Sequence, residues 1–78
     1  MPLFYFDVRQ SDKLVADTEG EELADVTAAQ REAAIAAVHL AKELLSDASG
    51  NLVVEVRNEM GKRVARAKVS LDVESLNF

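Results

Sequence analysis

One stretch of helical periodicity, flanked on both sides by alternating apolar and polar residues, limits the folds open to this chain. Residues 26–46 repeat apolar residues every three to four positions and contain neither proline nor glycine. Because 78 residues can build only one core, this helix must cover a sheet made from the flanking segments. The sequence therefore predicts an α+β domain of order ββαββ, with an antiparallel sheet of about four strands and one amphipathic helix on one face.

Residues 3–17 are predicted to form the first hairpin. Alternation in the first strand is typical of a half-buried strand whose aromatic side faces the core. Its inward residues are Phe4, Phe6 and Val8. A short polar connection of three residues, Gln10 to Asp12, follows. In the second strand, Leu14 and Ala16 are expected to point inward.

Residues 17–25 form an acidic turn, with five acids around Gly20. Asp25 is the preferred N-cap of the helix, and Thr27 with Gln30 is a competing capping box. Leu23 is expected to point inward. The core stripe predicted for helix 26–46 consists of Val26, Ala29, Ala33, Ala37, Leu40 and Leu44.

The second hairpin is predicted over residues 51–73. Its turn at residues 58–61 contains Gly61, which suits a bulged connection. Polar residues alternate with the apolar ones, so the other face of the sheet is expected to meet water. The inward residues are Leu52, Val54, Val56, Ala65, Ala67, Val69, Leu71 and Val73.

The chain resembles a bacterial family of small domains of unknown function whose members open Met-Pro-x-aromatic-x-Phe-Asp-Val-Arg. The resemblance implies a ββαββ domain and no assigned activity. A second, architectural likeness is to HicB-type antitoxin domains, in which strands precede a helix rich in alanine and glutamate. The family likeness rests on Met1, Pro2, Phe4, Phe6, Asp7, Val8, Arg9, the turn 17–20, and Val54-x-Val56-Arg57.

Charge and composition narrow the expected partners and location. The net charge is −5, which repels phosphate backbones, so nucleic acid is not expected as the default partner. The chain has no cysteine and its first residues lack a signal-peptide pattern, so a cytoplasmic location is expected. No stretch reaches membrane-spanning length.

No metal or cofactor site is predicted. His39 is the only histidine and has no cysteine with which to complete a transition-metal site. The acidic turn does not fit a calcium-binding EF-hand loop, because Glu22 occupies the glycine position and Ala28 the position of the bidentate glutamate.

The leading functional hypothesis is a non-enzymatic protein-interaction or self-associating module. On the helix, apolar residues fall well off the core stripe, with basic residues beside them, and a homodimer or a partner helix is the natural use of such a patch. The residues of this candidate patch are Arg31, Ile35, Val38, Lys42 and Leu45.

Two alternatives remain open. The C-terminal hairpin is locally basic, with Arg57, Arg66 and Lys68, which suggests an antitoxin-like or nucleic-acid-binding accessory, although the hairpin lacks the stacking aromatics of such sheets. Removal of Met1 would expose the secondary amine of Pro2, which suggests a tautomerase-like general base. Against this, proline is also common before an edge strand, where its missing N–H costs nothing.

Overall fold

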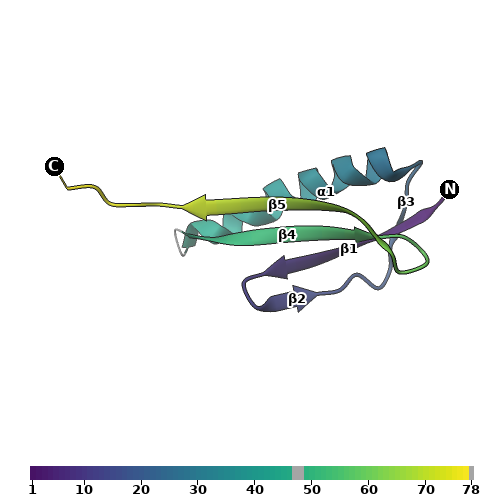
Figure 1. Ribbon diagram of the computed structural model, residues 1–78, viewed down its shortest axis with the longest axis horizontal. Helices are drawn as coiled ribbons and strands as arrows, with labels where there is room; N and C mark the ends of the chain where they lie inside the picture. Colours follow the sequence, from purple (N-terminus) through teal and green to yellow (C-terminus); the bar gives the residue numbers. More distant parts are fainter. Residues whose placement is uncertain (47–48, 78) are drawn as a thin grey trace.

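The computed structural model describes residues 1–46 and 49–77, and Figure 1 shows one helix packed on an antiparallel sheet. This arrangement confirms the predicted α+β class and the ββαββ order. The elements are β1 (Leu3–Gln10), β2 (Lys13–Val15), β3 (Glu21–Glu22), α1 (Val26–Leu40), the 3₁₀ helix η1 (Ala41–Ser46), β4 (Ser49–Arg57) and β5 (Arg63–Asp72).

The strand order in the sheet is β2-β1-β4-β5, and β3 also pairs with β1. β2 and β3 pair with successive parts of the same edge of β1. Val15 of β2 lies opposite Val8, and Glu21 of β3 lies opposite Phe4. The segment between them, residues 16–20, bulges away from β1. At the other border of the sheet, β5 pairs only with β4 among the described strands.

The core lies between α1 and the sheet. Three alanines of α1 are at most 1% exposed, so the helix approaches the strands closely. The predicted inward positions of β4 are confirmed, since each is completely buried. The buried residues are Phe4, Ala29, Ala33, Ala37, Leu44, Leu52, Val54 and Val56. Leu23 packs against this core from the acidic turn, as predicted.

The helix begins as predicted and changes its winding near its end. The Oδ1 atom of Asp25 accepts a hydrogen bond from the N–H of Ala28 at 2.8 Å, which confirms Asp25 as the N-cap. The predicted helix 26–46 is α-helical only to Leu40, and its last six residues form η1. Short 3₁₀ stretches are common where a helix ends, and this one is unusually long at six residues. It keeps Leu44 at 2% exposure against the sheet.

The inward orientation predicted for Leu14 and Ala16 is wrong. Gln10 pairs with Lys13, so the turn contains only Ser11 and Asp12, with Ser11 at φ 56°. The prediction assumed a three-residue connection, and a shift of one residue exchanges the two faces of a strand. Leu14 therefore lies opposite Arg9, away from the helix, and is 53% exposed, and Ala16 is exposed beyond the end of β2.

The turn between β4 and β5 is bulged, as predicted from Gly61. The pairing register shifts between Val56 and Arg57, and Gly61 has a φ of 81°. In β5 the apolar residues are half-buried under α1 and the polar residues are exposed, so the sheet has one polar face. Val73, predicted to point inward, lies beyond the end of β5 and is 61% exposed, because no part of α1 covers it.

Candidate interaction surfaces

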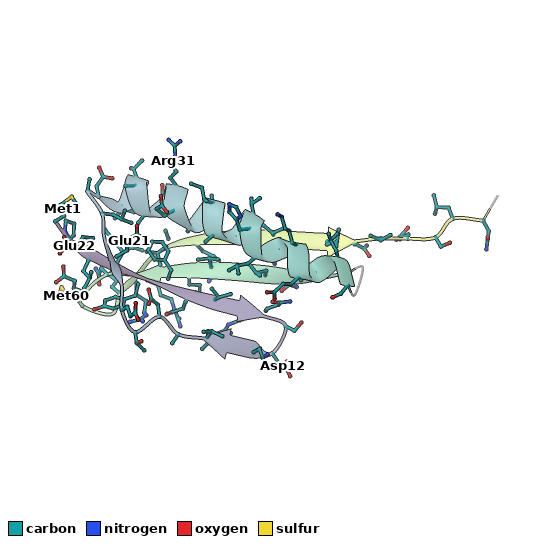
Figure 2. All side chains as sticks on the ribbon, turned by 180° about the vertical axis from the view of Figure 1, so that it is seen from behind. Met1, Asp12, Glu21, Glu22, Arg31 and Met60 are labelled. Carbon is teal, nitrogen blue, oxygen red and sulfur yellow. The ribbon has the colours of Figure 1, made fainter. Side chains whose placement is uncertain are left out.

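The face of α1 that points away from the sheet carries an apolar strip between two basic residues. Arg31, Ile35, Val38 and Lys42 follow each other at helical spacing and are all exposed, Ile35 to 44% and Val38 to 65%. We call these four residues the outer face of α1, although Lys42 lies just beyond α1, at the start of η1. Figure 2 shows Arg31 projecting from the helix away from the sheet. The structure therefore places four of the five predicted patch residues along one line.

A shallow apolar hollow lies on this face. Ala34, Ile35, Val38 and His39 line it, and its volume is about 320 Å³. The fifth predicted patch residue, Leu45, belongs to η1 and is 68% exposed. An apolar depression with cationic residues above and below it has the composition of an interface centre and its rim.

The polar face of the sheet is organised by an ion pair that joins β1 to β4. The Nε atom of Arg57 donates to the Oδ2 atom of Asp7 at 2.6 Å, and its Nη2 atom donates to Oδ1 at 3.1 Å. The guanidinium group also lies 4.8 Å from the ring centroid of Tyr5. Arg57, predicted as a contact residue for a partner, is thus engaged inside the domain.

Asp17 connects the bulged segment to this ion pair and to β1. Its Oδ2 atom accepts a hydrogen bond from the N–H of Phe6 at 3.1 Å, where no backbone of the bulge reaches β1. Its Oδ1 atom accepts from the N–H groups of Glu19 at 3.0 Å and Gly20 at 3.2 Å. The side chain of Asp17 therefore replaces a stretch of neighbouring strand.

Two further bonds close the network. The N–H of Asp17 donates to the Oδ1 atom of Asp7 at 2.9 Å, and the carbonyl of Asp17 accepts from the Nη2 atom of Arg57 at 2.9 Å. We call Asp7, Asp17 and Arg57 the Asp7 network. Sequence reasoning missed it, and the one local signal was the Asp17-x-x-Gly20 spacing, which is typical of a side-chain-capped turn.

The Asp7 network makes folding stability depend on pH. The hydrogen bond from Arg57 lowers the pKa of Asp7. Burial alone would raise the pKa of Asp17, but the N–H groups of Phe6, Glu19 and Gly20 lower it overall. Because both folded-state pKa values lie below the unfolded value of about 3.9, the contribution is complete above that pH and is lost as the pH falls through the folded values.

We therefore expect the free energy of unfolding, measured with urea, to fall as the pH is lowered below about 4. The D7N/D17N variant should start lower at pH 7 and fall less over the same interval. D12N, which alters an exposed carboxylate in the first turn, serves as the control. Equal acid dependence in the double variant and in D12N would contradict this assignment.

Two other basic residues of the second hairpin, Arg63 and Arg66, also lie beside an acid of their own domain. Glu55 is only 8% exposed and lies between Asp7 and Arg66 in the sheet register. Its Oε2 atom is 3.4 Å from Nε of Arg63 and 3.5 Å from Nη2 of Arg66. Lys68 lies on the same polar face, opposite Val53, and is exposed. Much of the positive charge predicted as a contact surface is balanced within the sheet.

The end of the domain near the first turn holds a larger hollow, of about 520 Å³. Val8, Val15, Leu40 and Leu52 form its apolar part. Polar groups at its border include Asp12 and Glu43. Within residues 1–46 and 49–77, no three histidine, cysteine or acidic side chains are grouped so that they could hold a metal ion.

Pro2 lies at neither hollow. It is exposed, and its carbonyl accepts a hydrogen bond from the N–H of Leu23 at 3.0 Å, next to the pairing of β1 with β3. The residue thus lies where the N-terminus is tied to the acidic turn. In the described part of the chain, no helix is long and apolar enough to cross a membrane.

Comparison with known proteins gives one match. A family model described as a domain of unknown function (DUF6894) matches residues 3–70. Neither a curated protein nor a solved structure matches the chain. The matched range contains the outer face of α1 and the whole Asp7 network.

Proposed function

The chain belongs to the DUF6894 family of domains of unknown function, and from its geometry we propose that it is a non-enzymatic interaction module that binds a protein partner through the outer face of α1. The observation that carries this proposal is the exposure of Ile35 and Val38 around an apolar hollow. Exposed apolar side chains that line such a depression can be buried at the centre of an interface, where most of the binding energy is concentrated.

The basic residues at both ends of the strip indicate the chemistry of the partner. Arg31 and Lys42 flank the apolar residues along the helix axis. A partner helix with apolar residues at matching spacing and acidic residues at its flanks would complement both features. The cations would then guide association and fix the register, while Ile35 and Val38 would supply the buried area.

The observations favour this proposal over a nucleic-acid-binding role. Arg57, Arg63 and Arg66 lie beside carboxylates of their own sheet, so a phosphate backbone would have to displace internal ion pairs. Neither β4 nor β5 contains an aromatic residue on which a base could stack. No observation on Pro2 supports a catalytic amine.

The test compares partners captured by the wild type with those captured by Ile35→Glu. We expect a stoichiometric partner to be retained by the wild type and reduced at least about tenfold by the variant, because a buried charge replaces an apolar anchor. Gln30→Glu is the matched control, since it adds the same charge at an exposed position of α1 outside the outer face.

Both variants should unfold within about 0.5 kcal/mol of the wild type, because the substituted side chains are exposed. Capture of the same partner by Ile35→Glu, or the absence of any partner at moderate salt, would overturn the proposed function. The melting curves of the purified baits distinguish a lost contact from a lost fold.

A further inference from the structure

β5 offers a long strand edge that no other strand within residues 1–46 and 49–77 pairs with. The strand is ten residues long, from Arg63 to Asp72, and pairs only with β4 among the described strands. In Figure 1 β5 lies at the border of the sheet, and the C-terminal residues continue beyond it in an extended path. Every second residue of such an edge directs its N–H and C=O groups outward, which makes the edge a template for another strand.

We propose that a second copy of this chain pairs with this edge, so that β5 of each copy forms an antiparallel pair about a two-fold axis near Val69. The paired segment comprises residues 66–72 of both copies. This surface is separate from the outer face of α1, and the inference goes beyond the partner proposed for that face.

Charge on the polar face and the length of β5 together favour this register. With the axis at Val69, Arg66 lies opposite Asp72 of the second copy, and Lys68 lies opposite Ser70. Both ends of the pairing then carry an opposite-charge pair, which stabilises neighbouring strands. An axis at Lys68 would place two lysines opposite each other, and an axis at Ala67 would place Arg66 opposite Lys68 twice. An axis at Ser70 would also place Lys68 opposite Asp72, but only residues 68–72 of β5 would then be paired, and the segment 66–72 is longer.

The apolar side of the strand agrees with the same register. Val69 meets its own copy, and Ala67 meets Leu71. Because α1 packs on β4 and β5, a two-fold axis perpendicular to the sheet places both helices on the same side of one continuous sheet.

Charge reversal tests the register. We expect D72K and R66E each to weaken dimerisation at least about tenfold in sedimentation equilibrium, because each variant turns two opposite-charge pairs into two like-charge pairs. An equimolar mixture of D72K with R66E should associate as strongly as the wild type, since the mixed dimer restores both pairs. Circular dichroism of each variant verifies that it remains folded.

Cysteine pairs provide a second test that does not depend on charge. The chain has no native cysteine, so K68C mixed with S70C should form a disulfide-linked dimer under mild oxidation. Each variant alone should not, because its own cysteines would lie two residues out of register. A disulfide-linked dimer in either single sample, or none between K68C and S70C in the mixture, would overturn the register.

The outcomes separate this inference from the proposed function. A wild type that is monomeric at about 100 μM, or a D72K variant that dimerises like the wild type, would overturn the pairing through β5. Self-association that is lost in Ile35→Glu and kept in D72K would also overturn it, but would leave the outer face of α1 as the binding surface.

Discussion

Replacing Asp7 by alanine is expected to lower the free energy of unfolding by about 2 to 3 kcal/mol. Asp7 is 9% exposed, receives two hydrogen bonds from Arg57 and accepts one from the N–H of Asp17. Its removal leaves that N–H and the guanidinium group without their acceptor in a half-buried position. Urea denaturation at pH 7 measures the change.

Two variants show whether the loss comes from this network. Asp12→Ala removes an exposed carboxylate of the first turn, and its effect should stay within about 0.5 kcal/mol. Asp7→Asn keeps a hydrogen-bond acceptor without the charge, so its effect should be intermediate. If Asp7→Ala is as mild as Asp12→Ala, the network does not hold the first strand to the fourth.

Replacing Gly20 by alanine is the second large effect, with an expected loss of about 2 to 4 kcal/mol. Gly20 has a φ of 76°, a conformation that costs an L-residue roughly 1 to 2 kcal/mol. An added Cβ atom would also lie 3.0 Å from Cε1 of Tyr5 and 3.1 Å from Cγ of Leu3. Relief of this contact would shift the turn that Asp17 holds.

Gly61 supplies the matched control. It has a similar φ of 81°, but nothing lies within 4 Å of an added Cβ atom. Gly61→Ala should therefore cost only the backbone strain, about 1 to 2 kcal/mol. The difference between the two variants, measured by thermal and urea unfolding, isolates the packing of the acidic turn on β1. Equal losses would show that this packing contributes nothing.

The elements that the sequence predicted correctly are those whose periodicity follows burial. Ala29, Ala33 and Ala37 recur once per helical turn, and each is buried against the sheet. Leu52 and Val54 alternate with polar neighbours for the same reason. Leu14 was assigned to the wrong face because β2 has only three residues, too few for alternation to outweigh the turn, and the turn fixed the register.

Of the surface features, the outer face of α1 was predictable from the sequence and the Asp7 network was not. The exposure of Ile35 and Val38 follows from their helical phase, which the sequence contains. The Asp7 network does not, because Arg57 and Asp7 are 50 positions apart in the chain and meet only once β1 and β4 are paired. Neither secondary-structure propensity nor the spacing of nearby residues predicts a contact between residues so far apart in the sequence. For this reason the sequence predicts Arg57 as a contact for a partner, whereas in the structure it forms an ion pair with Asp7 of its own domain.

The two borders of the sheet differ in length, and this difference limits how many chains can join. On the side of β1, the outer strands are a three-residue and a two-residue piece separated by the bulge that Asp17 fixes. Such short, interrupted edges resist further strand addition. If β5 is used in a two-fold pair, no long edge is left over, so growth stops at two copies and a fibre cannot propagate.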